Sequence, residues 1–208
     1  MKQLIAIVGN NSSPSTNRQL LCYMQDHFKD QAHIELMEIA GLPVFNKPSD
    51  KKEPKRVLEM AQKIEAADGV IISTPEYNHT IPSALRNALH WLSYYIYPLV
   101  DKPVMITGAS YGRLGSSRAQ AHLRQILDSN DIRARVMPNL EFMLGYSLQA
   151  FDEEGKLVDP AIRQQLDQIF AEYLIFCDLT NDLIQKYGSN KQEAKDFSWD
   201  KDKKEQIK

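Results

Sequence analysis

Short apolar runs rich in branched residues alternate along this chain with longer segments in which apolar residues recur at helical spacing. The short runs are typical of buried strands, and the longer segments are typical of amphipathic helices. Strands are predicted over residues 4–8, 34–39, 70–73, 103–107 and 132–137. Helices are predicted over residues 17–28, 57–67, 82–95 and 159–185, with a further helix that ends at Leu127.

This alternation predicts an α/β domain with a five-stranded parallel sheet covered by helices on both faces. Right-handed crossovers leave few strand orders, and 2-1-3-4-5 is one of them. At 208 residues the chain is long enough for one full domain, which we place at residues 1–186. Residues 187–208 are charged and nearly free of aliphatic side chains, so we expect a frayed tail. As an alternative, Phe197 and Trp199 of this tail dock on a neighbour.

Charge and cysteine usage narrow the class of protein. The net charge of −2 gives no electrostatic reason to expect nucleic acid or an anionic membrane as a partner. No run approaches the roughly 18 apolar residues of a membrane span. The apolar run near residue 1 is too short for the hydrophobic part of a signal peptide. Cys22 and Cys177 lie in apolar helical patterns, which predicts buried thiols in a reducing compartment. We therefore expect a soluble, cytoplasmic protein, without a metal site because its histidines lack ligand-type spacing.

Three loops are expected at the carboxyl edge of the parallel sheet, where ligands bind. The first, GNNSSPSTN, combines hydroxyl and amide side chains with the free N–H groups of a helix start. Such a helix start attracts anions, so a phosphate fits here without a lysine, although plain helix capping explains the same residues. The polar residues singled out in this loop are Asn10, Ser12, Ser15, Thr16 and Asn17.

The second and third loops suit a planar ligand. In TPEYNHT, Pro75 stiffens the backbone, while Tyr77 offers a flat surface and Asn78 an amide. The alternative is that Glu76 is a solvated charge and Tyr77 a packing residue. In GASYGRLGSS, three glycines allow close approach of the backbone to a ligand, or simply make a flexible turn.

The stretch TPEYNHTIPSALRNALHWLS resembles the signature of the NADPH-dependent FMN reductase family, within the flavodoxin-like superfamily. The resemblance extends to both other loops and covers the chain to about residue 175. The matching residues are Thr74, Pro75, Glu76, Tyr77, Asn78, Pro82, Leu85, Arg86, Asn87 and Trp91, then Gly9, Ser15 and Asn17, and finally Ser110, Gly112 and Gly115.

The resemblance implies a flavodoxin-like fold of strand order 2-1-3-4-5, an FMN cofactor, and NADPH or NADH as co-substrate. Hydride would pass through FMN to a small-molecule acceptor, namely free flavin, a quinone or an azo compound, with no catalytic side chain required. The first loop would hold the FMN phosphate, and the other two loops would line the ring. The implied cofactor-binding residues are Asn10, Ser12, Ser15, Thr16, Asn17, Pro75, Glu76, Tyr77, Asn78, Ser110, Tyr111 and Gly112.

Several positions depart from the family pattern. Ser12 stands where the family has an arginine, so a charged phosphate contact is missing, and Arg18 either compensates or faces solvent. Asn10 replaces a serine and Tyr111 a proline. Arg113 replaces a glycine and either meets the phosphate of NADPH or faces solvent.

The segment HWLSYYIYPL, residues 90–99, is hydrophobic nearly all round. It predicts a helix at a homodimer contact, with a plain core helix as the alternative, and we expect a homodimer or homotetramer. Two other functions stay open: an FMN-binding electron-transfer module that serves a partner protein, and a protein that has lost its flavin.

Overall fold

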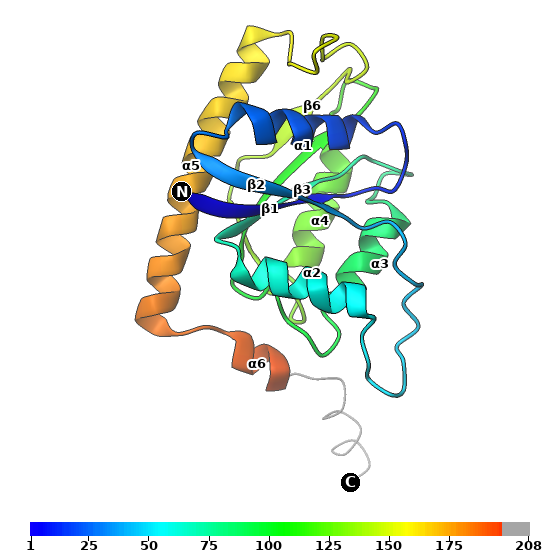
Figure 1. The fold of residues 1–208 in the computed structure, drawn as a ribbon, viewed down its shortest axis with the longest axis vertical. Helices are drawn as coiled ribbons and strands as arrows, with labels where there is room; N and C mark the ends of the chain where they lie inside the picture. The colour runs from blue at the N-terminus through cyan, green and yellow to red at the C-terminus, as the bar shows by residue number, and fades with distance from the viewer. Residues whose placement is uncertain (197–208) are drawn as a thin grey trace.

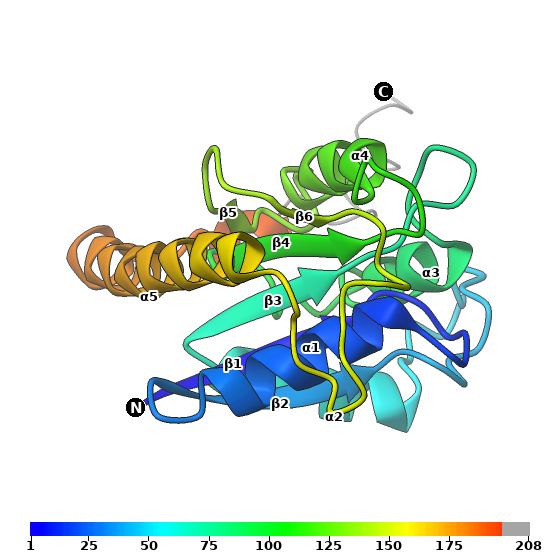
Figure 2. The same cartoon turned by 90° about the horizontal axis from the view of Figure 1, so that it is seen from above.

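The computed structural model describes residues 1–196, in which six parallel strands form one sheet between two layers of helices (Figures 1 and 2). The strand order is β2-β1-β3-β4-β5, and β6 also pairs with β4. This confirms the predicted fold class and strand order. The strands are β1 (Lys2–Val8), β2 (Ala32–Glu38), β3 (Gly69–Ser73), β4 (Pro103–Ala109), β5 (Arg135–Val136) and β6 (Phe142–Leu144). The helices are α1 (Thr16–His27), α2 (Lys55–Ala66), α3 (Ser83–Trp91), α4 (Ser117–Leu127), α5 (Pro160–Tyr187) and α6 (Lys191–Asp196).

The central strands are apolar throughout because both faces of the sheet are buried. In β1, Ile5 and Ile7 pack with α2, α3 and α4, whereas Leu4 and Ala6 face α1 and α5. The pairing of β1 with β3 and of β3 with β4 is parallel and in continuous register. The loops after β1, β3 and β4 therefore meet at one edge of the sheet.

The last strands differ from the prediction. The predicted strand over residues 132–137 is reduced to two residues, Arg135 and Val136, which pair with the start of β4. The carboxyl end of β4 pairs instead with β6, a strand that was not predicted. A three-residue run is too short to show a strand period, so only the tertiary pairing reveals β6.

The predicted helix over residues 82–95 ends at Trp91, and the helical reading of residues 90–99 is wrong. The chain turns here, with a positive φ at Tyr95. The hydrophobic side chains face this chain itself: Tyr94 packs edge-on against Phe45, and its hydroxyl donates to the Pro48 carbonyl at 2.8 Å. The buried residues of this segment are Trp91, Leu92, Tyr94, Tyr97, Pro98 and Leu99.

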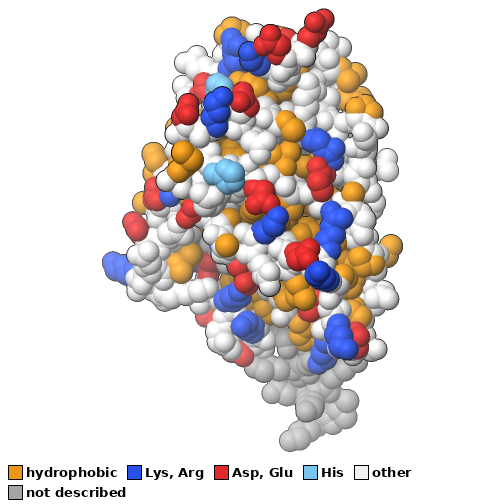
Figure 3. Space-filling model, in the orientation of Figure 1, with side chains coloured by type: hydrophobic (Ala, Val, Ile, Leu, Met, Phe, Trp, Pro, Cys, Tyr) orange, Lys and Arg blue, Asp and Glu red, His pale blue; other side chains and the backbone are white. Residues whose placement is uncertain are grey.

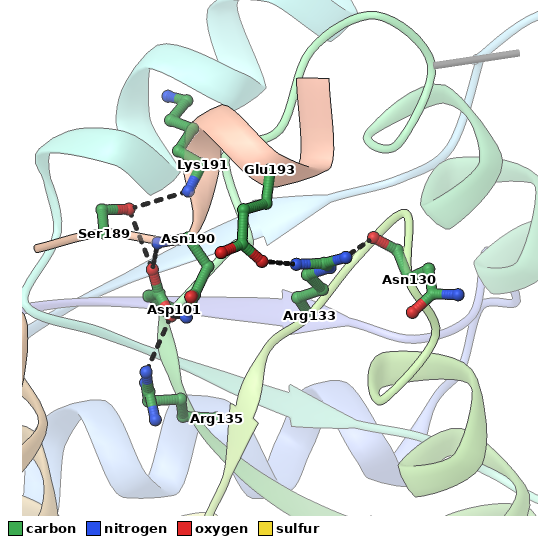
Figure 4. A network of polar contacts seen from close by, with 8 residues as sticks. All are labelled: Asp101, Asn130, Arg133, Arg135, Ser189, Asn190, Lys191 and Glu193. Carbon is green, nitrogen blue, oxygen red and sulfur yellow. Dashed lines mark hydrogen bonds and ion pairs between the residues drawn. The ribbon is translucent and has the colours of Figure 1, made fainter. Parts of the chain in front are cut away.

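The first part of the predicted tail is folded, so the expectation of fraying is wrong for residues 188–196. The buried Asp101 carboxylate accepts hydrogen bonds from the Asn190 backbone N–H at 2.6 Å, the Asn190 amide at 2.7 Å and the Ser189 hydroxyl at 2.8 Å (Figure 4). Arg133 pairs with Glu193 at 2.8 Å. These contacts seat α6 on the body of the domain. The alternative that Phe197 and Trp199 dock on a neighbour concerns residues that lie outside the described part of the chain.

The two cysteines differ in environment. Cys177 is buried as predicted, and burial raises the pKa of its thiol to about 11. Cys22 is exposed, because the buried side of α1 is formed by Leu20, Leu21 and Met24, so the prediction of burial is wrong for Cys22. Within residues 1–196, no helix has both the length and the apolar character that a bilayer crossing requires.

Candidate functional site

A cleft of about 510 Å³ opens where the loops after β1, β3 and β4 meet. Its volume lies within the range of about 300–1,000 Å³ that is typical of small-molecule sites. The lining includes every predicted cofactor-binding residue except Asn78: Asn10, Ser12, Ser15, Thr16, Asn17, Pro75, Glu76, Tyr77, Ser110, Tyr111 and Gly112. The other residues that line the cleft were not predicted to contact FMN, and these are Pro14, Ala109, Arg113, Leu114, Ser116 and Arg118.

The first loop is organised by its own side chains. Asn10 is buried, and its amide joins two hydroxyls, donating to Ser12 Oγ and accepting from Ser15 Oγ, both at 2.9 Å. Ser15 also caps α1, since its Oγ accepts from the Arg18 N–H at 3.2 Å. The N–H groups of Thr16 and Asn17 lie in the first turn of α1, where no carbonyl of the helix is in position to accept from them. The loop therefore caps α1 and also gathers N–H and hydroxyl groups at the cleft.

Asn17 fixes the distance between the three loops. Its side-chain oxygen accepts from Ser73 Oγ and from the Ala109 N–H, and its nitrogen donates to the Ala109 carbonyl, all at 2.9 Å. The residue is only 2% exposed. The side chain predicted to help bind a phosphate is thus a positioning group, which ties α1 to the ends of β3 and β4 and leaves its backbone N–H for the cleft.

The second loop approaches β1 so closely that Gly9 is required there, because a Cβ would lie 2.4 Å from the Ser73 carbonyl oxygen. The loop ends in a tight turn, in which the backbone groups of Tyr77 and Thr80 exchange hydrogen bonds of 2.9 and 3.0 Å. The two central residues, Asn78 and His79, have φ values of 50° and 65°. Asn suits this left-handed position. Asn78 is exposed at the tip and is not among the residues that line the cleft, so a contact between Asn78 and the cofactor stays a prediction.

The Glu76 side chain binds the N-terminal end of α4. Its carboxylate accepts from the backbone N–H groups of Arg118 and Ala119 at 3.1 and 3.4 Å, and from Arg118 Nε at 2.6 Å. The residue before α4, Ser116, has a φ of 65° and does not cap the helix with its own side chain. Glu76 therefore caps α4 from another loop, and the alternative of a solvated charge is wrong, since its side chain is 10% exposed.

The third loop is held by the residues that follow β6. The Ser110 N–H donates to the Leu144 carbonyl at 3.0 Å, and the Ser147 N–H donates to the Ser110 carbonyl at 2.9 Å. Ser147 Oγ also donates to Thr16 Oγ1 at 2.9 Å, which links this segment to the first loop. The loop is thus anchored rather than a free turn. No sequence signal marked Ser147, because its role depends on tertiary pairing.

The cleft carries a small excess of positive charge. Its lining contains two arginines, Arg113 and Arg118, and one acid, Glu76, which pairs with Arg118. Arg113 is exposed and forms no ion pair within residues 1–196. Arg18 pairs with Glu38 through two contacts of 2.9 and 2.6 Å, so it does not replace the phosphate contact missing at the first loop.

Two further signature residues support the site from outside the cleft. The Asn87 side chain accepts from the Phe45 N–H at 2.7 Å and donates to the Pro43 carbonyl at 2.9 Å. Trp91 Nε1 donates to the same carbonyl at 2.8 Å. These bonds fix the connection between β2 and α2 against α3, and this explains an asparagine and a tryptophan four residues apart on one helix face.

Known proteins resemble this chain over most of its length. Residues 2–149 match the NADPH-dependent FMN reductase family. The chain is 51% identical over 195 residues to the NADH:(hydroxy)cinnamate reductase subunit CrdA of Vibrio ruber, covering 94% of this chain and 96% of that protein. It is 42% identical over 181 residues to the NADH-dependent flavin reductase subunit 2 of Lactobacillus johnsonii, covering 85% and 97%.

A solved structure shows the same fold. The flavoenzyme NAD(P)H:(acceptor) oxidoreductase FerB of Paracoccus denitrificans superposes with a TM-score of 0.73 at 25% identity, covering 88% of this chain and 98% of that one. The sequence match and the fold agree with the three-loop cleft at the sheet edge. The chain therefore belongs to the NADPH-dependent FMN reductase family and is an FMN-dependent NAD(P)H oxidoreductase.

Proposed function

We propose that the cleft formed by the three loops holds FMN, with the phosphate at the start of α1. The observation that supports this placement is the convergence of Ser12, Ser15 and Thr16 with the free N–H groups of the first turn of α1. Helix starts with such donors bind phosphate through the N–H groups and the helix dipole. Neutral donors replace the arginine contact that the family pattern has at position 12.

The remaining loops suit the ring end of the cofactor. Pro75 is buried and stiffens a backbone wall, while Tyr77 and Tyr111 are 46% and 60% exposed at the mouth of the cleft. Bound FMN supplies hydride acceptance from NAD(P)H and delivery to a small acceptor such as free flavin, a quinone or an azo compound. The residues of this chain bind and orient the reactants and stabilise negative charge through backbone dipoles. Glu76 is occupied by α4, so no side chain is assigned as acid or base.

We assign to Arg113 the recognition of a phosphate of the nicotinamide dinucleotide. It lies at the mouth of the cleft on a loop whose backbone is held by the Gly112 carbonyl accepting from the Tyr146 N–H at 3.0 Å. Its guanidinium is free to form charge-assisted hydrogen bonds.

A second candidate function has specific support. Two relatives that align with 94% and 85% of this chain are both described as subunits of reductases. We therefore propose that this chain also passes electrons to a partner subunit. Turnover of NAD(P)H with a free quinone distinguishes the two roles, because a pure electron carrier oxidises little NAD(P)H until its partner is added.

The number of chains in the assembly and the cellular location of the protein are also proposals. We propose a homodimer or homotetramer that works in the cytoplasm. The free thiol of the exposed Cys22 supports a reducing compartment. The apolar segment of residues 90–99 no longer supports the assembly, since it is largely buried within this chain.

The placement of FMN is tested by titrating the apoprotein with FMN and following the quenching of flavin fluorescence. Ser15→Asp keeps a good cap for α1 but puts a negative charge at the phosphate end, so we expect FMN affinity to fall by about 100-fold or more. Ser129→Asp, an exposed change beyond α4, is the matched control and should leave FMN affinity unchanged. Unchanged binding by Ser15→Asp would place FMN elsewhere.

A further inference from the structure

The third loop places an aromatic ring and a cation at the mouth of the cleft. Tyr111 and Arg113 both line the cleft and flank Gly112 in the sequence. Tyr111 is 60% exposed, and Arg113 is exposed as well. Within residues 1–196, neither the Tyr111 hydroxyl nor the Arg113 guanidinium has a hydrogen-bond or ion-pair partner. Small-molecule sites combine aromatic side chains with a few polar groups that fix the orientation of the ligand, and this pair supplies both.

The backbone beneath these two side chains is held in place by neighbouring segments. The Gly112 carbonyl accepts from the Tyr146 N–H at 3.0 Å and from the Ser110 hydroxyl at 2.9 Å. Gly145 lies so close that a Cβ there would be 2.5 Å from the Arg113 carbonyl oxygen. In Figure 2 the segment after β6 runs beside the loop that leaves the carboxyl end of β4. The ring and the cation therefore project from a fixed backbone, which lowers the conformational entropy lost when a ligand binds.

Arg113 is the one uncompensated charge among the described residues that line the cleft. The other two charged residues there, Arg118 and Glu76, pair with each other through a contact of 2.6 Å from Arg118 Nε. The exposed lining near Arg113 is aromatic or apolar, since Tyr77 from the second loop is 46% exposed and Leu114 is 47% exposed. A ligand complementary to this mouth has a flat apolar ring and one negative group.

We propose, on the basis of the FMN placement proposed above, that Tyr111 and Arg113 select a flat aromatic electron acceptor that carries an anionic group. The ring of such an acceptor stacks on the Tyr111 ring, and its carboxylate, sulfonate or phosphate accepts hydrogen bonds from the Arg113 guanidinium. The overall reaction is balanced, because NAD(P)H, a proton from water and a quinone give NAD(P)⁺ and a hydroquinone. Anionic quinones are preferred to neutral quinones of the same ring system, and free FMN is preferred to riboflavin, which lacks the phosphate.

Arg113 serves the dinucleotide and the acceptor in turn. Both substrates reach the same FMN through the same mouth, so the oxidised nicotinamide leaves before the acceptor enters. Arg113 meets a phosphate of the dinucleotide in the first half of the reaction and the anionic group of the acceptor in the second half. Its loss weakens both contacts, and the second is isolated only when the reoxidation of the protein is measured without the dinucleotide.

The test is rapid mixing of the reduced, FMN-loaded protein with naphthoquinone or with naphthoquinone sulfonate, which share one ring system. One equivalent of dithionite reduces the protein, so no dinucleotide contributes to the result. We expect Arg113→Ala to lower the second-order rate constant of reoxidation by about tenfold for the sulfonate and by less than about twofold for the neutral quinone. Because each quinone is compared with itself in wild type and variant, the difference in their intrinsic reactivity cancels. The preference for the sulfonate should also shrink at high salt, which screens exposed charges.

The role of the ring is tested in the same experiment. Tyr111→Ala should lower both rate constants by about fivefold, because stacking does not depend on the charge of the acceptor. Tyr111→Phe keeps the ring and should recover both constants to within about twofold of the wild type. Arg86→Ala, an exposed arginine outside the cleft, is the matched control for the loss of charge and should leave the ratio of the two constants unchanged.

Flavin content, measured on every variant, separates a failure of the proposed FMN site from a failure of acceptor selection. A wild-type protein that holds no FMN, or whose reduced FMN neither quinone reoxidises, overturns the proposed function and acceptor selection together. A flavin-loaded protein that both quinones reoxidise, but in which Arg113→Ala lowers the two constants equally or not at all, overturns acceptor selection alone. Full reoxidation rates in Tyr111→Ala overturn the assignment of the ring.

Discussion

Asn17 illustrates how a buried side chain can set the geometry of a cleft without completing it. It forms three hydrogen bonds of 2.9 Å to groups on β3 and β4. Asn17→Ala would leave Ser73 Oγ and both backbone groups of Ala109 without these partners. Because each unsatisfied buried group costs about 1–3 kcal/mol, we expect the free energy of unfolding to fall by about 2–4 kcal/mol.

Urea unfolding followed by circular dichroism measures this change. Asn11→Ala, in the same loop but exposed, is the matched control and should change the unfolding free energy by less than about 0.5 kcal/mol. FMN affinity should fall together with stability in Asn17→Ala, because the three loops lose their common anchor. An unfolding free energy equal to that of the wild type would remove Asn17 from this role.

Arg113 is expected to act on the nicotinamide substrate rather than on FMN. Arg113→Ala should raise KM for NAD(P)H by about tenfold while kcat changes little, because an exposed charge contributes binding energy to the ground state and the transition state alike. Steady-state kinetics with a quinone measures both constants. The control is Arg86→Ala, an exposed arginine on α3 outside the cleft. If FMN affinity falls and KM does not, the residue serves the cofactor phosphate and our assignment is wrong.

For single residues, the sequence motif predicted which loops line the cleft, but it predicted the role of each side chain less well. The cleft brings together nearly all of the expected residues. Asn17 and Glu76, however, act through hydrogen bonds to neighbouring elements, and Asn78 serves a turn. These roles depend on which backbone groups the folded chain brings near each side chain, and sequence spacing does not contain that information.

At the scale of elements, the capping of α4 by Glu76 couples two loops of the cleft. Glu76→Ala removes the acceptor for the N–H groups of Arg118 and Ala119, and should lower the free energy of unfolding by about 1–2 kcal/mol. Glu76→Gln keeps an acceptor oxygen and should cost about half as much. Glu153→Ala, an exposed change, is the control. Equal stability of Glu76→Ala and the wild type in urea would contradict the capping role.

The docking of α6 should depend on pH. Burial by itself raises the pKa of Asp101, but the hydrogen bonds from Asn190 and Ser189, with the nearby Arg135, outweigh it and hold the pKa below its usual value. The folded pKa is thus lower than the unfolded one, so this stabilisation is fully present above the unfolded value of about 3.9. It is lost as the pH falls through the folded value.

Hydrogen exchange of the amides in residues 189–196 measures this docking. We expect protection at neutral pH, loss of protection in acid below about pH 4, and loss at neutral pH in Asp101→Asn, which removes the charge. Asn tolerates the φ of 60° at this position, so backbone strain is not introduced. Protection in β1 and β3 serves as the internal control. Unchanged protection of residues 189–196 in Asp101→Asn would show that the buried apolar cluster of Ala194 with Tyr97 and Val100 suffices for docking.

The sequence predicted the elements with long buried runs and missed the short ones. β1, β3 and β4 are central strands, whose apolar character is continuous and easily read. β6 and α6 are too short to show a period, and both are held by contacts distant in sequence. The turn segment after Trp91 resembled a helix because its aromatic side chains are buried by tertiary contacts: Tyr94 packs against Phe45, and Tyr97 clusters with Val100 and Ala194.

For the whole molecule, topology determines where the cleft lies. Parallel strands in the order β2-β1-β3-β4-β5 bring three loops to one edge, and the right-handed crossover rule together with the family resemblance made this order predictable. Positive and negative side chains are interspersed over the face shown in Figure 3, in keeping with the net charge of −2. Nothing on that face favours a polyanionic partner.

We propose that FMN bound in this cleft takes hydride from NAD(P)H. The most direct test is the visible absorption spectrum of the purified protein reconstituted with FMN and freed of excess, recorded without oxygen before and after addition of NADH or NADPH. We predict a flavin spectrum that bleaches on addition of the nicotinamide and returns when a quinone is added. A protein that retains no flavin after reconstitution, or whose bound flavin stays oxidised, would contradict the account.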